Sequence, residues 1–262
     1  MTETAEEIAQ DYLTRRAEAR LLPAEGAAAR VPDLAGALSV QAAIEARLTA
    51  DGARPIGWKI GATSQVARDM LGVNQPFRGR LFDRTTCDSG GEVPRGDGVF
   101  QVWEVEIALR IGADLDPGRA PFSADEVRAA TAAMLPAIEI VGSAWVPFNK
   151  APAFDLIADN AVHGHWIRGA EMPDWSGMDL DDGPIRLILD GAEQAAGRGA
   201  NVDGGPFGST AWLANHLAES GLGLRVGEYV TTGTVTPLVP IGTVHDAVAD
   251  FGPLGSVSVT LV

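Results

Sequence analysis

The sequence has very little cysteine and very little lysine. Its 262 residues contain one cysteine, Cys87, which excludes an internal disulfide framework and a zinc site built on several thiolates. Two of the 20 basic residues are lysines, Lys59 and Lys150, and the others are arginines. Each lysine therefore stands out from the composition and is a candidate functional residue.

The chain also lacks a long hydrophobic run and an excess of basic residues. No apolar run reaches the ~18–20 residues that cross a bilayer, and the acidic, amphipathic N-terminus is not typical of a targeting segment. The net charge of −15 disfavours binding to nucleic acid, which needs clustered lysine and arginine. We therefore expect a cytoplasmic protein that binds neither nucleic acid nor membranes. There is no nucleophile elbow, P-loop or dinucleotide fingerprint to support a serine hydrolase, an NTPase or an NAD enzyme.

Hydrophobic periodicity predicts helices first and strands later. Apolar residues at helical spacing predict helices over 4–21 and 34–50, and frequent glycine and proline favour short strands and loops over 57–98. Alternation predicts a strand over 99–111. A capping-box pattern at Ser123 predicts a helix over 124–135 that Pro136 stops. Later strands are predicted over 137–145, 162–168, 185–190, 228–232 and 255–262, with a helix over 209–220.

This distribution predicts an α+β protein rather than a regular βαβ alternation. No segment has the composition of a linker. We expect residues 1–262 to form a single catalytic domain. Its residues 1–56 are a helical N-terminal part, and residues 57–262 are a β-rich catalytic core.

Two glutamates of the predicted strand over 99–111 are separated by two positions. Because side chains alternate across a strand, Glu104 and Glu106 point to the same face, and Trp103 and Val105 point to the other. Two carboxylates so close together repel unless they are solvated or neutralised. A hard divalent cation such as Mg²⁺ is one interpretation, and a solvated sheet face with two surface glutamates is the alternative.

Two more charged residues lie within short apolar strands. Glu139 lies between Ile138 and Ile140, so it is either exposed at a sheet edge or paired inside a site. With the other two glutamates it would complete a carboxylate triad, although spacing does not prove that the two strands are neighbours. Lys59, flanked by apolar residues and glycines, suits a ligand carboxylate or acid–base chemistry; a surface lysine is the alternative.

Three further groups are weaker candidates. His163 and His165 alternate on one strand and could ligate a metal, but no third nitrogen or sulfur ligand is near them in sequence. Asp159 and Asn160 precede them as either a helix end or part of a site. The turn over 231–234 offers hydroxyl and backbone N–H groups for a carboxylate, or it is an ordinary turn.

Six segments follow one another along the chain in the order GWKIGATS, LGVNQPFRGRLFD, WEVEIALRI, LPAIEIVGS, DLIADNA and EYVTTGTVTPLVPI. As an ordered set, they resemble the fumarylacetoacetate hydrolase superfamily. Within it they are most similar to the 2-keto-4-pentenoate hydratase and 4-oxalocrotonate decarboxylase branch. The resemblance implies a helical N-terminal part followed by a mixed, strongly curved β-roll. It also implies a Mg²⁺ or Mn²⁺ site with Glu104, Glu106 and Glu139 as ligands and Lys59 as the catalytic lysine.

The resemblance also implies an activity. It indicates a metal-dependent lyase of aromatic meta-cleavage breakdown, commonly a homo-oligomer, that adds water to a small 2-hydroxy-2,4-dienoate or 2-oxo-4-enoate acid. The alternatives are a decarboxylase of a 4-oxalocrotonate-like dioate and a C–C hydrolase of acylpyruvates. The hydrolase is disfavoured because all four histidines lie at position 163 or later. A binding module that has lost the chemistry is a further alternative.

One segment departs from the hydratase pattern. Hydratases of this branch usually have Q-P-D-F-G, whereas this chain has Phe77 and Arg78 between Gln75-Pro76 and Gly79. We expect residues 72–79 to form a loop over the site, with Arg78 either binding a second substrate carboxylate or pointing to solvent. The substrate-binding residues expected in the chain are Arg78, Asp159, Asn160, Thr232 and Gly233.

Overall fold

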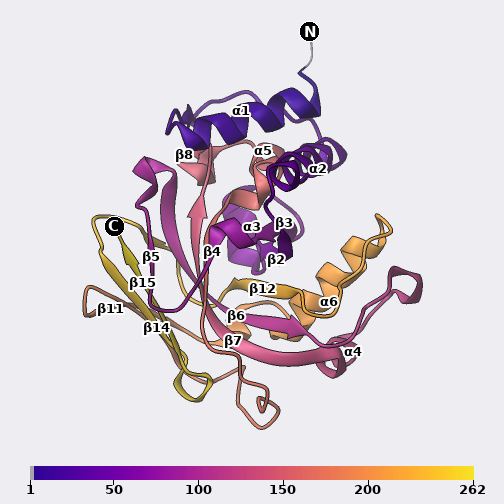
Figure 1. Cartoon of the computed structure of the whole chain (residues 1–262), viewed down its shortest axis with the longest axis vertical. Helices are drawn as coiled ribbons and strands as arrows, with labels where there is room; N and C mark the ends of the chain where they lie inside the picture. Colours follow the sequence, from indigo (N-terminus) through magenta and orange to yellow (C-terminus); the bar gives the residue numbers. More distant parts are fainter. Residues whose placement is uncertain (1–2) are drawn as a thin grey trace.

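The structure is a computed structural model that describes residues 3–262. Two helices form its N-terminal part, α1 (Ala5–Ala17) and α2 (Leu34–Ala50). Thr4 and Glu7 form a capping box at α1, and Asp33 caps α2, which satisfies backbone N–H groups that a helix start leaves unpaired. Both predicted helices are confirmed, although α1 ends four residues before the predicted end. Figure 1 shows them together at one end of the molecule.

The rest of the chain is built on two sheets. The larger has eight strands in the order β3-β2-β12-β6-β7-β9-β4, with β13 also paired to β6; the smaller has the order β11-β10-β14-β15-β5. Both contain parallel and antiparallel pairs, and β6 and β7 curve through the middle of the molecule (Figure 1). The predicted α+β class with a mixed, curved sheet is confirmed. The bounds are β2 Pro55–Gly61, β3 Phe77–Phe82, β4 Thr86–Asp88, β5 Gly91–Val93, β6 Phe100–Ile111, β7 Thr131–Gly142, β9 His163–Arg168, β10 Ile185–Leu189, β11 Ala192–Gly197, β12 Tyr229–Thr234, β13 Val239–Pro240, β14 Asp246–Asp250 and β15 Ser256–Leu261.

Strand β6 separates the main hydrophobic core from the opposite face of its sheet. Trp103, Val105 and Ile107 are fully buried in a core shared with β10, β15 and two helices, α4 (Ala124–Ala130) and α6 (Gly205–Ala218). The alternate residues Glu104 and Glu106 point away from this core. Among residues 3–262, no helix is long and apolar enough to cross a membrane.

A second core joins the N-terminal helices to residues from the middle of the chain. It includes Ile8 and Tyr12 of α1 together with Trp145, which lies on β8 (Trp145–Val146) beside β1 (Leu22–Pro23). The Tyr12 hydroxyl donates to buried Asp155 at 2.5 Å and accepts from the indole N–H of Trp145. These buried contacts fix α1 on the part of the chain that follows the N-terminal helices.

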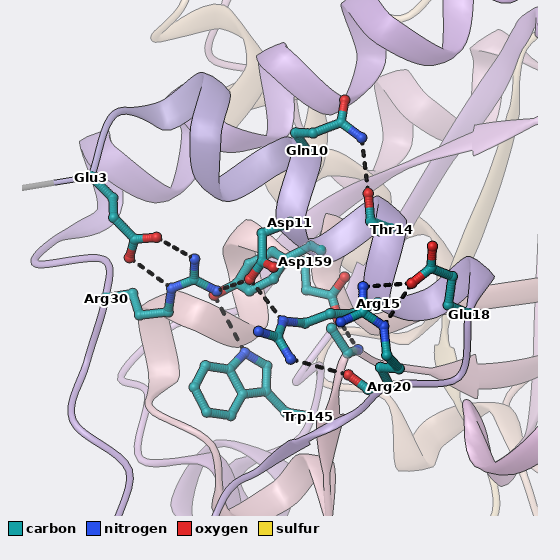
Figure 2. A network of polar contacts seen from close by, with 12 residues as sticks. Glu3, Gln10, Asp11, Thr14, Arg15, Glu18, Arg20, Arg30, Trp145 and Asp159 are labelled. Carbon is teal, nitrogen blue, oxygen red and sulfur yellow. Dashed lines mark hydrogen bonds and ion pairs between the residues drawn. The ribbon is translucent and has the colours of Figure 1, made fainter.

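Ion pairs cover the outer side of this junction. Figure 2 shows Arg30 between Glu3 and Asp11, with nitrogen–oxygen distances of 2.6 and 2.7 Å. The Arg30 backbone N–H also donates to Asp155 at 3.1 Å. The segment between the two N-terminal helices is therefore held to the same buried carboxylate as Tyr12.

Two local predictions are wrong. The helix predicted over 124–135 ends at Ala130, and β7 begins at the next residue. Residues Ala133 to Leu135 are fully buried beside β6, so tertiary packing overrides the helix propensity of this alanine-rich stretch. Pro136 lies inside β7 opposite Ile107, and its carbonyl accepts from the Gly169 N–H just beyond β9, so the proline is tolerated at the end of the β7–β9 pairing.

The expected loop over 72–79 is also shorter than predicted. A helix that the sequence did not indicate, α3 (Gln65–Leu71), ends at Gly72, and β3 already begins at Phe77. Ser64 caps α3 and Gly72 takes the left-handed conformation at its end. Phe77 and Arg78 are therefore strand residues, and cross-strand pairing fixes the face that each occupies.

The buried carboxylate of Asp155 provides a test of the junction. Replacing it by Ala leaves the Tyr12 hydroxyl and the Arg30 N–H without their acceptor, so we expect Asp155→Ala to lower the free energy of unfolding by about 3 kcal/mol. Urea denaturation followed by circular dichroism measures this. Asp174→Ala, at an exposed position without a side-chain hydrogen bond to the described residues, is the control and should stay within about 0.5 kcal/mol of the wild type. Equal stability of the two variants would contradict the proposed anchoring.

Candidate active site

Three glutamates from two neighbouring strands meet on one face of the larger sheet. Glu104 of β6 lies directly opposite Glu139 of β7 in the antiparallel register. Glu106 lies two residues along β6, on the same face as Glu104. One oxygen from each residue lies within 4.8 Å of the other two. The structure thus brings together the three carboxylates that the sequence indicated, here called the carboxylate cluster.

The carboxylate cluster is buried and incompletely hydrogen-bonded. Glu106 and Glu139 have no exposed surface, and the side chain of Glu104 is 17% exposed. Neither oxygen of Glu106, nor Oε2 of Glu139, accepts a hydrogen bond of normal geometry from the described residues. Buried polar atoms are rarely left in this state. A hard divalent cation takes oxygen ligands, so these residues fit a Mg²⁺ or Mn²⁺ site.

Burial and mutual repulsion control the charges of the cluster. Burial, reinforced by the Glu139 and Glu104 carboxylates, raises the pKa of Glu106 well above its usual range; the nearby Gly233 N–H offsets this only in part. Burial also raises the pKa of Glu104 to about 7, although Lys59 attracts its negative charge. Three full negative charges are therefore unfavourable here unless a cation compensates them.

Lys59 is the cation that the chain itself supplies to the cluster. Its Nζ lies 2.9 Å from Oε1 of Glu139 and 4.0 Å from Oε2 of Glu104, and its side chain is 2% exposed. Burial works to lower the pKa of Lys59, but the glutamates outweigh it and raise that pKa, so the ammonium is retained. Gly79 lies opposite Lys59 on β3, where a Cβ atom would come within 3.0 Å of the lysine side chain.

His163 of β9 adds a second donor to Glu139. Its Nδ1 lies 3.0 Å from the same Oε1 that Lys59 contacts, and its Nε2 lies 3.0 Å from the Thr85 hydroxyl. Burial lowers the pKa of His163 despite the carboxylate, which favours a neutral imidazole. Although burial opposes it, the combined effect of Lys59 and His163 holds the pKa of Glu139 below its usual range. The strand alternation singled out His163 but gave no sign of its partner Thr85.

A cavity of about 280 Å³ opens beside Lys59 and Glu104. Gly233, which the sequence indicated, lines it with a φ of +104°. A Cβ atom at this position would lie 1.9 Å from the Thr63 hydroxyl, so the close approach requires glycine. Small-molecule sites commonly have volumes of roughly 300–1,000 Å³, so this cavity suits a small acid rather than a large cofactor.

Three other predicted site residues lie in the surrounding structure and do not line this cavity. Asp159 accepts from the Ser143 hydroxyl and the Ala144 N–H at 2.9 and 2.7 Å. Asn160 pairs with both backbone groups of Arg80, and the Thr232 hydroxyl donates to the Ile107 carbonyl. These hydrogen bonds hold the backbone around the site in place.

Arg78 also lies away from the cavity. It is paired across the strands with Ile60, whereas Lys59 is paired with Gly79, so Arg78 and Lys59 occupy opposite faces of β2 and β3. The Arg78 guanidinium lies 4.9 Å from the centre of the Trp58 ring. Burial, reinforced by neighbouring Arg80, lowers the pKa of Arg78 to about 10. The arginine is thus a largely buried strand residue: it is not on the predicted loop, it does not point to solvent, and it does not line the cavity.

Most of the chain is similar to a known protein family and to individual members of it. The family model described as "Fumarylacetoacetate (FAA) hydrolase C-terminal" matches residues 66–262. The chain is 37% identical over 194 residues to a 2-hydroxyhexa-2,4-dienoate hydratase of Comamonas testosteroni, with 73% of this chain and 72% of that protein covered. It is 32% identical over 234 residues to a 4-oxalocrotonate decarboxylase of Pseudomonas sp. (strain CF600), with 88% and 87% covered.

The chain is also similar to solved structures of a 4-oxalocrotonate decarboxylase. The chain superposes on 4-oxalocrotonate decarboxylase from Pseudomonas putida G7, complexed with magnesium and adipate, with a TM-score of 0.90 and 28% sequence identity. The alignment covers 98% of this chain and 97% of that one. The same decarboxylase complexed with calcium and acetate gives a TM-score of 0.88.

Glu106 provides a test of the cation site. We expect Glu106→Gln to weaken Mg²⁺ binding at least tenfold. Replacing a residue that only orients a metal ligand typically lowers metal affinity about 10–100-fold, and replacing the ligand itself should lower the affinity further. The metal-free variant should be at least as stable as the wild type, because a neutral amide replaces a buried carboxyl group whose negative charge is unfavourable there. Isothermal titration calorimetry and thermal unfolding measure the two effects. Unchanged Mg²⁺ affinity in a folded variant would exclude Glu106 as a ligand.

His163 provides a second test, because it acts on Glu139 from outside the cluster. His163→Asn shortens the side chain that orients Glu139, so we expect Mn²⁺ affinity to fall about tenfold or more. His165→Asn is the matched control, since His165 makes no side-chain hydrogen bond to the described residues. The outcome that rules out an orienting role is the same affinity in both variants, measured by calorimetry on protein of native circular dichroism.

Proposed function

The chain belongs to the fumarylacetoacetate hydrolase family, and from that premise we propose that it is a divalent-metal-dependent hydratase of a small 2-hydroxy-2,4-dienoate acid. One observation carries this proposal: three carboxylates converge beside a buried lysine, and two members of this group, Lys59 and Glu104, line a small, largely apolar cavity. The relatives named as hydratases support the reaction class. The activity is that of a lyase in aromatic meta-cleavage breakdown.

The carboxylate cluster holds the cation in this proposal. Glu104, Glu106 and Glu139 supply the oxygen ligands, and the unpartnered oxygens of Glu106 and Glu139 support this assignment. When bound, Mg²⁺ or Mn²⁺ acts as a Lewis acid toward the carboxylate and 2-oxygen of the substrate. The buried site excludes bulk water, which strengthens each charge interaction within it. His163 and Lys59 orient Glu139 from two sides.

Lys59 is the proposed catalytic residue. Hydration moves the proton of the 2-hydroxyl to C5, after which water supplies a hydroxyl to C4 and a proton to C3. The Lys59 ammonium, held charged by the glutamates, stabilises the negative charge that develops on the 2-oxygen during the first step. Its fixed position on β2, between the paired strands β3 and β12, keeps the donor aligned without reorganisation.

A second candidate activity is decarboxylation of a 4-oxalocrotonate-like dioate. The observation that favours it is the likeness over nearly the whole chain to the 4-oxalocrotonate decarboxylase structure. The same charge on a 2-oxygen develops when CO₂ leaves, so Lys59 and the carboxylate cluster serve either reaction. The two activities differ in the far end of the substrate, which carries the second carboxylate only in the dioate.

The wider setting of the activity is also part of the proposal. We propose that residues 1–262 act as one catalytic domain, since residues of α1, α2 and the 141–162 region share the second core. We further propose a cytoplasmic homo-oligomer that acts on a small-molecule 2-oxo acid. The acidic net charge of −15 supports the absence of nucleic acid among its partners.

The proposed function is tested with the two lysines of the chain. Purified protein loaded with Mg²⁺ or Mn²⁺ should consume 2-hydroxypenta-2,4-dienoate and yield the 4-hydroxy-2-oxo acid, identified by NMR. Lys59→Met should lower kcat at least 100-fold, in line with the loss of a buried charge donor, and should retain metal binding. Lys150→Met is the control, because Lys150 is exposed; its kcat should be unchanged.

Three results would overturn parts of this proposal. Full activity of Lys59→Met removes Lys59 from the mechanism. Release of CO₂ from a dioate without hydration of any dienoate assigns the decarboxylase instead. Absence of turnover in both assays by metal-loaded protein refutes the enzyme.

A further inference from the structure

The cavity has two chemically different ends. Among its lining residues, Lys59 and Glu104 are the ionisable side chains, and both lie at the carboxylate cluster. The other lining side chains are mostly apolar. We infer that the preferred substrate carries an apolar substituent at the end away from its 2-oxo acid group, and that the cavity rejects a second carboxylate there. This inference rests on the proposed function, which places the 2-oxo acid group at the cluster.

The direction of β2 separates the two ends. Lys59 points into the site, and Gly61 lies on the same face about 7 Å further along the strand. The chain then passes residues 62–64 and enters α3, which forms the far wall. Gly61 allows the Phe77 ring to lie against the strand between the two ends of the cavity, because a Cβ atom at position 61 would lie 2.4 Å from that ring. The aromatic ring therefore borders the middle of the cavity.

The far wall is apolar and partly open. Val66, Met70 and Leu71 of α3 line the cavity together with Phe77 and Phe148. Val66 is 79% and Met70 is 40% exposed, which is unusual for large apolar side chains in this structure. An alkyl group in the cavity would cover this surface and remove it from water. The far wall thus offers hydrophobic contact to the end of a substrate.

Among residues 3–262, Lys59 is the one cationic side chain that lines the cavity, and Lys150 near Phe148 is exposed and outside the lining. Arg78 faces the other side of β2 and β3, as its pairing with Ile60 shows. Arg68 of α3 points away, with its guanidinium bound to the Ala62 carbonyl and to Asp203 at 2.7 Å. Lys59 is engaged by Glu139. A carboxylate placed against the apolar wall would lose hydration without a compensating partner.

The hydroxyl groups in the cavity do not change this conclusion. Ser64 caps α3 by accepting from the Ala67 N–H, and Thr234 donates to the Thr236 carbonyl. Thr63 contacts Gly233, whose N–H faces Glu106 of the cluster. These three residues therefore belong to structure already in use or to the end of the cavity that holds the acid group. The remaining lining hydroxyl, that of Thr236, is buried without a partner among the described residues, but one uncharged hydroxyl does not compensate a buried carboxylate as a cation would.

The inference is tested first by binding, which does not depend on turnover. In the presence of Mg²⁺, 2-oxohexanoate should bind at least tenfold more tightly than 2-oxoadipate, the same chain with a second carboxylate, in titration calorimetry. A pocket of this kind typically discriminates by about 10–200-fold for a change in one apolar group. Equal or tighter binding of 2-oxoadipate would overturn the inference even if the protein is a hydratase.

Kinetics then separates this inference from the proposed function. We expect kcat/KM to rise in the order 2-hydroxypenta-2,4-dienoate, 2-hydroxyhexa-2,4-dienoate and 2-hydroxyocta-2,4-dienoate, which carry hydrogen, methyl and propyl at C5. We expect 4-oxalocrotonate to be the poorest substrate. Hydration of all dienoates at one rate refutes the apolar preference and leaves the hydratase. Binding that follows the expected order without turnover of any dienoate refutes the hydratase and leaves the preference.

A positive charge placed on the far wall should weaken the preference for the apolar ligand. Met70→Lys puts an ammonium on the partly exposed wall, so the ratio of 2-oxohexanoate to 2-oxoadipate affinity should fall at least tenfold. Val226→Lys is the matched control, because Val226 is 60% exposed in a turn outside the cavity lining. Val226→Lys should keep the wild-type ratio. If Met70→Lys keeps it too, α3 does not contact the far end of the ligand.

Discussion

The electrostatics of one buried cluster constrain the rest of this structure. Glu104, Glu106 and Glu139 converge where little of their surface reaches solvent, and the chain supplies a single lysine against them. Charges in such an environment interact far more strongly than at a surface. Burying them is costly unless they are paired or bind a cation. A site of this kind therefore requires a scaffold that holds the carboxylates together despite their repulsion.

The larger sheet provides that scaffold through strand pairing. β6 and β7 pair over almost their full length and place Glu104 opposite Glu139. β12 joins β6 to the strand that carries Lys59. The opposite face of β6 packs into the main core, so movement that would separate the carboxylates also disrupts hydrophobic packing. The stability of the fold is thus coupled to the geometry of the site.

Strand periodicity predicts several residues of the site, but it does not predict which residues from other strands they contact. The two-residue period placed Glu104 and Glu106 on one face, whereas the position of Glu139 depended on strand pairing, which no local pattern reveals. The same limit explains Arg78. The Gly- and Pro-containing stretch before it predicted a loop, but β3 begins at Phe77, the residue before Arg78, and the pairing of β3 with β2 places Arg78 on the face opposite to Lys59. The contact of His163 with Thr85 joins residues 78 positions apart, beyond the reach of a local motif. Helix α4 ends early because non-local burial of the following residues decides their structure.

The central claim is that the carboxylate cluster is a divalent-cation site, and crystallography with anomalous scattering tests it most directly. Crystals soaked in Mn²⁺ should show one strong anomalous peak between Glu104, Glu106 and Glu139, with an oxygen of each residue within about 2.0–2.6 Å of it. A peak elsewhere, or an empty cluster at a Mn²⁺ concentration that saturates the protein in solution, would contradict the account.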